Sequence, residues 1–212
     1  MRWWKENSLS IVLATLAIAC LALQVWSGWL VDSQERGQAG RHALGLLQYL
    51  GSGAFLAATF ENWESEFLQM GMYVLLTVKL RQRGSAESRP FDPAEENPRV
   101  DAGVTPWPVR RGGLWAALYG HSLSAALLLL FLISLGLHLL GSWRHALELG
   151  ELAPGTSVLE YLGEATFWFE SMQNWQSEFM AVFALVVLSI FLRQKDSPES
   201  KPVEAPHRQT GD

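Results

Sequence analysis

The chain has little cysteine, little charge and no surplus of basic residues, and each shortage excludes a class of protein. Cys20 is the only cysteine in 212 residues, so a secreted fold held together by disulfides is excluded. Charged residues make up 17% of the chain, below the roughly 25% of a soluble domain. The net charge is −5 and no basic face is organised, which argues against a nucleic-acid partner. An integral membrane protein remains.

The usual signatures of catalysis are also missing. The sequence has no phosphate-binding Gly-rich loop, no GxSxG nucleophile and no HExxH zinc motif. His121 and His138 are 17 residues apart on one expected helix. That spacing separates them by ~25 Å, so they cannot ligate one metal or haem together. We therefore expect no enzyme activity, no metal site and no cofactor.

Long uncharged runs are what the chain does contain. Residues 7–31 have no charged side chain, and residues 112–143 have none besides two histidines. Each run exceeds the ~20 residues that cross a bilayer. Two shorter apolar runs, 67–78 and 179–192, become long enough only with the polar stretch that precedes each. We predict four transmembrane helices, near residues 8–30, 58–80, 114–140 and 171–192.

The lysine and arginine side chains predict the orientation in the lipid bilayer. Thirteen of the 16 fall before the first span, between the second and third, or after the fourth. Only three fall in the two opposite loops. By the positive-inside rule, both termini and the central linker are cytoplasmic.

The two halves of the chain resemble each other. At an offset of 114, residues 7–29 match residues 121–143 at eight of 23 positions. At an offset of 112, residues 49–90 match residues 161–202 at 18 of 42 positions. Each half holds two spans, so both halves enter the membrane with the same polarity, as parallel repeats. We predict an all-α four-helix bundle with pseudo-two-fold symmetry. Its expected parts are a first repeat (1–82), a cytoplasmic linker (83–113), a second repeat (114–194) and a disordered cytoplasmic tail (195–212).

Short helices are expected in both outer loops. Ser157 followed by Glu160 has the spacing of a capping box, which predicts a helix that ends near Gly163. Its counterpart in the first loop is the segment 44–50. The pattern leaves open whether residues 43–57 and 157–168 lie at the interface or re-enter the membrane.

A stripe of asparagine, serine and glutamate follows one face of the second and fourth spans. Its members, which form a candidate proton or cation site, are Asn62, Ser65, Glu66, Asn174, Ser177 and Glu178. Each glutamate precedes a cytoplasmic arginine by 15 residues, roughly 22 Å along a helix, so both carboxylates are expected in the outer half of the bilayer. Pseudo-symmetry lets Glu66 and Glu178 face each other. Two carboxylates that share a site cannot both ionise cheaply, so the pair is expected to hold a proton or cation as a unit.

The same stripe has a structural interpretation. Asparagine and glutamate side chains hydrogen-bond across membrane helices and fix their packing. The neighbouring Glu61 and Glu64 are replaced by Gln173 and Gln176 in the second half, so their charge is not needed twice. We expect Glu61 and Glu64 at the membrane interface, outside the site.

A second duplicated motif follows the second and fourth spans. LRQRGSAESRP and LRQKDSPESKP match at seven of 11 positions, although no core requires these polar residues. One interpretation is a basic cluster that anchors the chain to the membrane, followed by a capped turn. The other is a docking site for a partner protein or for lipid headgroups. The docking residues would be Arg81, Gln82, Glu87, Arg193, Gln194 and Glu199.

The segments FENWESEFLQMG, LRQRGSAESRP, PWPVRRGGL, QNWQSEF and LRQKDSPESKPV resemble a family of small bacterial multi-pass membrane proteins classed as a domain of unknown function. The resemblance implies a bacterial inner-membrane protein without an assigned activity. From the residues, we expect the glutamate pair to handle a proton or small cation in a transporter, channel or sensor. The alternative is a non-catalytic scaffold or accessory protein that recruits a cytoplasmic partner. Four spans enclose little room for a pore, so a channel would need a homo-oligomer or a membrane-protein partner.

Overall fold

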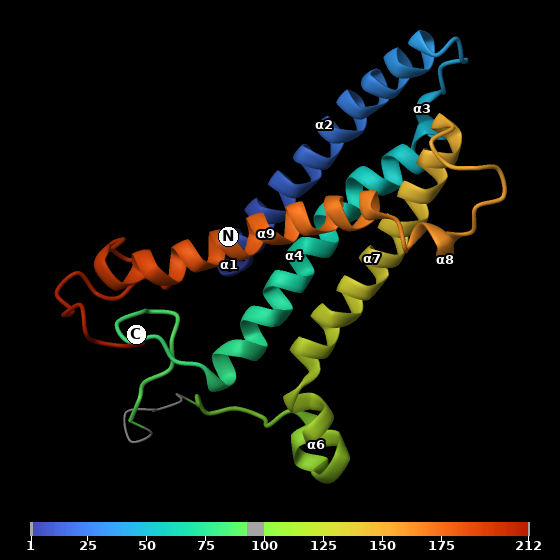
Figure 1. The fold of residues 1–212 in the computed structure, drawn as a ribbon. Helices are drawn as coiled ribbons and strands as arrows, with labels where there is room; N and C mark the ends of the chain where they lie inside the picture. The colour runs from blue at the N-terminus through green and yellow to red at the C-terminus, as the bar shows by residue number, and fades with distance from the viewer. Residues whose placement is uncertain (1, 93–99, 212) are drawn as a thin grey trace. The chain divides into compact units, whose positions relative to one another are not determined.

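The computed structural model describes residues 2–92 and 100–211, and within these ranges every regular element is a helix. The helices are α1 (Arg2–Glu6), α2 (Ser8–Gln38), α3 (Leu46–Tyr49), α4 (Gly53–Lys79), α5 (Trp107–Arg111), α6 (Gly113–Gly120), α7 (Ser122–Leu149), α8 (Val158–Tyr161) and α9 (Ala165–Phe191) (Figure 1). The predicted all-α class is therefore confirmed for the described residues.

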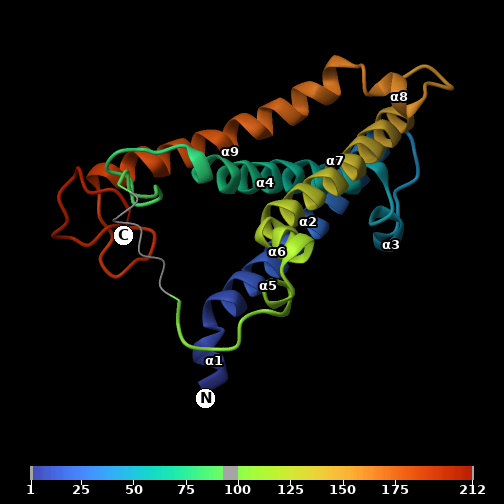
Figure 2. The ribbon, with the colours of Figure 1, turned by 90° about the horizontal axis from the view of Figure 1, so that it is seen from below.

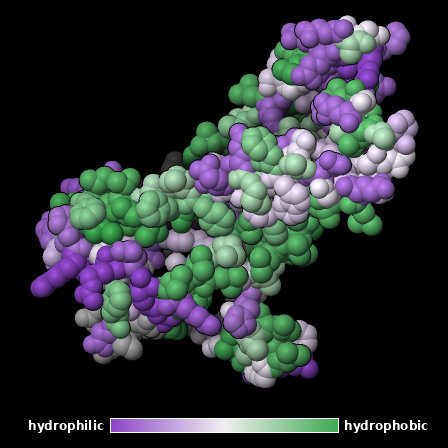
Figure 3. Space-filling model, viewed as in Figure 1, coloured by the Kyte–Doolittle hydropathy of each residue, from purple (hydrophilic) through white to green (hydrophobic). Residues whose placement is uncertain are grey.

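Three helices, α2, α7 and α9, are long and apolar enough to cross a membrane. They expose many large hydrophobic side chains, and Figure 3 shows hydrophobic surface over much of α7 and over the C-terminal half of α9. α4 is not among these helices, because every stretch of it long enough to cross a membrane contains several charged residues. These residues are Glu61, Glu64, Glu66 and Lys79. The segment predicted as the second span is thus helical, while its crossing of the bilayer and the four-helix bundle stay predictions.

The segment predicted as one span near residues 114–140 is divided into two helices. α6 ends at Gly120 and α7 begins at Ser122, because the backbone of His121 has φ −116° and ψ 6°, outside the helical region. The hydroxyl of Ser122 donates to the carbonyl of Tyr119 at 2.8 Å. A side chain that bonds the backbone in this way competes with the regular helical hydrogen bond. The apolar run alone gave no sign of this break.

Helix ends recur at the offsets found in the sequence. Asn7 separates α1 from α2 with φ −119° and ψ 12°, 114 residues before His121. α3 and α8 begin and end 112 residues apart, as do α4 and α9. The local conformations of the two halves thus follow the sequence alignment, while their pseudo-two-fold symmetry in space stays a prediction.

Contacts within the chain group it into two compact units. The first comprises Met1–Phe60 with Leu137–Glu164, and the second comprises Glu61–Gly136 with Ala165–Asp212. The first unit thus contains the loops that follow α2 and α7, and the second contains the polar stripe and both copies of the motif that follows α4 and α9. The predicted division into two repeats, a linker and a tail stays a prediction.

In the first unit, each short helix carries a buried tyrosine whose hydroxyl contacts the long helix that precedes it. Tyr49 of α3 packs its hydroxyl against Gly28 of α2, and Tyr161 of α8 shares a 2.7 Å hydrogen bond with Ser142 of α7. Gly28 and Ser142 occupy equivalent positions in the two halves. Gly28 leaves room for the phenol of Tyr49, and Ser142 hydrogen-bonds to the phenol of Tyr161. Both tyrosines are almost completely buried.

The outer loops are further fixed by indole and capping hydrogen bonds. Trp29 donates to the carbonyl of Leu44 at 2.7 Å, and Trp143 donates to that of Thr156 at 3.0 Å. At α8, the backbone of Ser157 donates to the carboxylate of the third helical residue at 2.6 Å, and the Ser157 hydroxyl accepts in return at 3.2 Å. The predicted capping box is therefore confirmed.

Candidate functional site

In the second unit, the side chain of Glu64 on α4 is completely buried. The indole of Trp175 on α9 donates to its Oε1 at 3.1 Å. Two helical turns along α4, Gly71 lies against α7, where an added Cβ would stand 3.5 Å from the Cβ of Leu127. That distance is an ordinary van der Waals contact, so α7 packs beside this part of α4. A buried carboxylate is costly without a hydrogen-bond donor, and the indole of Trp175 supplies one to Glu64.

Aromatic rings surround the indole that binds Glu64. The ring of Trp175 meets Phe131 at 5.8 Å and Trp168 at 6.5 Å between centroids, both near edge-to-face. Such pairs stabilise packing beyond the area they bury and place an apolar wall beside the carboxylate. We call this group the acid–aromatic cluster; its members are Glu61, Glu64, Phe131, Trp168, Asn174 and Trp175.

Asn174 connects the polar stripe to this cluster. Its amide donates to the carboxylate of Glu61 and also to the carbonyl of Glu170 at 3.2 Å. We expected Asn174 to flank Glu66 and Glu178 as a neutral ligand. In the structure it donates to Glu61 and to a carbonyl of its own helix, so it positions a carboxylate outside the predicted set.

Glu66 and Glu178 lie close enough to interact electrostatically, as pseudo-symmetry suggested. Glu178 is half-buried, whereas Glu66 is exposed. The two carboxylates therefore share a neighbourhood, but only one of them is partly shielded by the described chain.

The two serines of the stripe bond to their own helices. Ser65 donates to the carbonyl of Asn62, and Ser177 donates to that of Asn174, each at 2.8 Å. Ser65 is buried, while Ser177 and Asn62 are exposed. Both hydroxyl hydrogens are thus used within a helical turn.

The structure buries Glu64 within the chain, while its expected place at the membrane interface stays a prediction. Replacement by Gln176 in the second half suggested that its charge had no role, and Gln176 is indeed exposed. Glu64 is buried where the indole of Trp175 on α9 donates to its carboxylate. This partner lies 111 residues away in the chain, so no pattern within α4 indicated the burial.

The two duplicated motifs, which follow α4 and α9, form the same turn. The backbone N–H of Gln82 donates to the hydroxyl of Ser88, and that of Gln194 donates to Ser200, each at 2.9 Å. Inside each turn, the N–H of the motif glutamate donates to the preceding serine hydroxyl at 3.2 Å. Equivalent residues therefore make equivalent bonds 112 positions apart.

The motif arginines close the ends of α4 and α9 in the same way. Nη1 of Arg81 donates to the carbonyl of Thr77 at 3.3 Å, and Nη1 of Arg193 donates to that of Ser189 at 3.2 Å. Carbonyls of a last helical turn lack intrahelical donors, and a cation there also complements the helix dipole. Both arginines thus have a local structural role.

Lys201 joins the tail to the first motif. It is almost fully buried, and its ammonium donates to the carbonyls of Gly84, His207 and Gln209, the last two at 3.0 and 2.9 Å. Burial lowers the pKa of Lys201, with a further contribution from the charge of Arg193. Figure 2 shows the segment after α4 beside the tail after α9, in agreement with these bonds.

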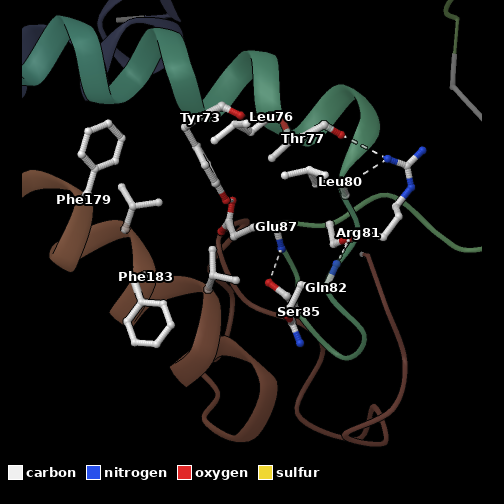
Figure 4. A pocket seen from close by; sticks show the side chains of 13 residues that line it. Tyr73, Leu76, Thr77, Leu80, Arg81, Gln82, Ser85, Glu87, Phe179 and Phe183 are labelled. Atoms are coloured by element: carbon white, nitrogen blue, oxygen red, sulfur yellow. Dashed lines mark hydrogen bonds between the residues drawn. The ribbon is translucent and has the colours of Figure 1, made fainter.

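A cavity of about 400 Å³ lies between the C-terminal halves of α4 and α9. Arg81, Gln82 and Glu87 of the predicted docking set line it, together with Tyr73 and Phe183 (Figure 4). The other three docking residues, Arg193, Gln194 and Glu199, are not among its lining residues. The sequence gave no indication of this cavity, because α4 and α9 supply its walls from residues more than 100 positions apart.

The described residues contain no group of three His, Cys, Asp or Glu side chains arranged to hold a metal ion. In comparisons with known proteins, the whole chain, residues 1–212, matches one family, described as a domain of unknown function (DUF6766). No curated protein and no solved structure matches the chain.

Proposed function

The chain belongs to the DUF6766 family, and we propose that it is a bacterial inner-membrane protein that handles protons or a small cation through acids buried among its helices. The observation that carries this proposal is the complete burial of Glu64 against Trp175. Ionisable side chains at membrane depth are expensive, and their usual roles are proton relays and ion pathways.

Three further acidic residues join Glu64 in the proposed proton or cation site. Glu61 accepts from Asn174, and Glu66 interacts with Glu178 on the facing helix. Neighbouring carboxylates at membrane depth repel each other when both are charged, so the proposed set would hold a proton or a cation in common. The protein would act as a transporter, channel or sensor component, and a channel would require self-association or a membrane-protein partner.

The test is ion flux in proteoliposomes that contain the full chain and a trapped pH-sensitive dye. The wild-type protein is expected to pass protons or a small cation above the protein-free background. Glu66→Gln combined with Glu178→Gln, and separately Glu64→Gln, should return the flux to that background while the helical circular dichroism is kept. Glu204→Gln in the exposed tail is the matched control. Wild-type flux and pH response in all variants would overturn the proposal.

The alternative function is a membrane scaffold that recruits a cytoplasmic partner. The observation that favours it is that two polar motifs adopt one hydrogen-bonded turn, at Ser88 and at Ser200. Alanine at Arg81, Glu87, Arg193 and Glu199 together should then remove a copurifying partner. Alanine at Arg110 and Arg111, which lie outside the motifs, should leave it bound. An unchanged set of copurifying proteins in the fourfold variant would contradict the scaffold role.

A further inference from the structure

The cavity between α4 and α9 has apolar walls. Leu76 of α4 and Leu80, which follows the end of α4, line one side, and Val182, Phe183 and Val186 line it from α9. Phe183 is 62% exposed, so the cavity has a hydrophobic rim as well as a hydrophobic interior. Its volume of about 400 Å³ falls within the range of small-molecule sites.

A carboxylate faces this apolar space. Glu87 reaches in from the first cytoplasmic motif, and its Oε2 accepts a hydrogen bond from the hydroxyl of Tyr73 at 3.2 Å. Figure 4 shows the carboxylate directed toward Tyr73, with Phe179 and Phe183 on the α9 side. Glu199 of the second motif also acts electrostatically on Tyr73. Two acids therefore make the potential at Tyr73 more negative.

The basic lining residue is turned away from this carboxylate. Nη1 of Arg81 donates to the carbonyls of Thr77 and Val78 at 3.3 and 3.2 Å, which holds the guanidinium at the end of α4. In Figure 4 it lies beyond Leu80, on the far side from Phe179. Arg81 thus bonds to carbonyls at the end of α4, and the Glu87 carboxylate is directed toward Tyr73.

Apolar walls, aromatic rings and one carboxylate together select a particular ligand chemistry. Apolar ligand surface is stabilised when it leaves water for the cavity, and a positive charge is attracted both by Glu87 and by the faces of Tyr73 and Phe183. An anion of the same size would be repelled by Glu87 and Glu199. A neutral apolar ligand would desolvate the carboxylate without compensation.

We propose that the α4–α9 cavity binds a free hydrophobic organic cation, with its charge at Glu87 and its apolar groups against Phe183 and the neighbouring aliphatic side chains. This site is separate from the acid–aromatic cluster, because none of the cluster residues lines the cavity. It goes beyond the proposed function, and its test has a different readout, so either can fail without the other.

The test is equilibrium binding of radiolabelled tetraphenylphosphonium to the full chain in dodecyl maltoside, an uncharged detergent. We expect saturable binding that is weakened at least about tenfold by Glu87→Gln, which keeps the shape and the bond to Tyr73 but removes the charge. Glu199→Gln is the matched control, because it removes the equivalent motif charge from outside the cavity. It should weaken binding less than about threefold, since its charge acts at longer range.

Two further arms address the apolar wall and the source of the ligand. Phe183→Ala removes an exposed ring and should weaken binding several-fold without loss of helical circular dichroism. Tetraphenylborate, which has the same shape and the opposite charge, should not displace the label, and neither should phosphatidylethanolamine. The proposal is overturned if binding is not saturable, if Glu87→Gln and Glu199→Gln weaken it equally, or if tetraphenylborate competes. Displacement by phosphatidylethanolamine would also overturn it, because the occupant would then be a lipid.

Discussion

Several buried polar side chains of this protein have a specific hydrogen-bond partner. Lys201 is the example outside the expected spans: its ammonium is enclosed by backbone carbonyls of the tail and of Gly84. Arg89, at the same position of the first motif, is exposed. One of two equivalent basic residues has therefore become a link between segments, and the motif sequences alone do not distinguish them.

Replacing Lys201 by glutamine should release the tail. The amide cannot supply three donors to converging carbonyls, so the exposed Glu204 beside it should be cleaved several-fold faster by an endoprotease specific for glutamate. Limited proteolysis of the full chain, followed by mass spectrometry, measures the rate. Arg89→Gln is the control and should leave the cleavage rate unchanged. Equal rates for the wild type and Lys201→Gln would show that the ammonium does not hold the tail.

The capping box of α8 predicts a pH-dependent stability. Hydrogen bonds from the backbone and hydroxyl of Ser157 lower the pKa of Glu160 below its ordinary value of 4.5. A lowered pKa means that the ionised form favours the folded state. Its contribution is complete above pH 4.5 and is lost as the pH falls through the lowered pKa.

Glu160→Gln should accordingly unfold at a lower temperature than the wild type at pH 7, and the difference should disappear toward pH 3. Thermal unfolding followed by circular dichroism in detergent measures it. Glu164→Gln, an exposed neighbour beyond α8, should show no such pH-dependent difference. A gap that stays constant from pH 7 to pH 3 would contradict the assignment of the effect to the carboxylate.

At the scale of elements, periodicity and length predicted most of the helices. The predicted helix at 171–192 overlaps α9 closely, and the capping-box spacing located α8. The break at His121 was missed because it depends on one residue's dihedral angles and on a serine hydroxyl, while the apolar run continues through it. Hydrophobicity indicates which surface is buried. It does not indicate where a side chain replaces a backbone hydrogen bond and interrupts a helix.

The candidate site was predictable only in part. Spacing placed Glu66 and Glu178 at equivalent positions, and these two do interact. The burial of Glu64 was not predicted, because it depends on a neighbour in another helix, Trp175. Contacts between distant segments are invisible to a pattern along one helix, so the buried acid and the α4–α9 cavity needed the three-dimensional structure.

Two glycines let α4 and α7 approach closely in the first unit. A Cβ at Gly53 would stand 2.7 Å from the carbonyl oxygen of Gly141 and 2.6 Å from the backbone nitrogen of His145. A Cβ at Gly141 would collide with the backbone of Ala57. Small residues at such crossings are typical of helices that pack without a hydrophobic driving force.

Gly141→Ala should therefore lower the free energy of unfolding by about 1–3 kcal/mol, because backbone atoms cannot move aside as a side chain can. Gly136→Ala, on the same helix and with nothing near its added Cβ, should be neutral or stabilising by up to ~1 kcal/mol. Unfolding in mixed micelles, monitored by circular dichroism, compares the two. Equal effects of the two substitutions would show that close approach is not what position 141 requires.

For the whole molecule, the open question of topology is whether α4 crosses the bilayer. Three acidic residues in one helix each oppose insertion by roughly 2.5–3.5 kcal/mol at the bilayer centre. α9 supplies compensation, since Asn174 donates to Glu61 and Trp175 donates to Glu64. We expect α4 to be retained in the membrane because α9 is beside it, a dependence that hydropathy along α4 alone does not reveal.

Four crossings and three crossings predict opposite results at every position after α4. In a Cys20→Ser background, single cysteines at Asp101, Gly155 and Glu204 report the linker, the second outer loop and the tail. Four crossings put only position 155 outside, so a membrane-impermeant maleimide should label it in intact cells and reach the other two only after lysis. If α4 does not cross, the linker and tail are outside and position 155 is inside.

A cysteine at Lys5 is the control and should be protected in both cases, because the N-terminal segment precedes α2. The basic linker favours the first outcome, since the lysine and arginine of short loops stay in the cytoplasm. Labelling of positions 101 and 204 in intact cells would remove α4 from the membrane, and with it the lipid-buried acids on which proton handling depends.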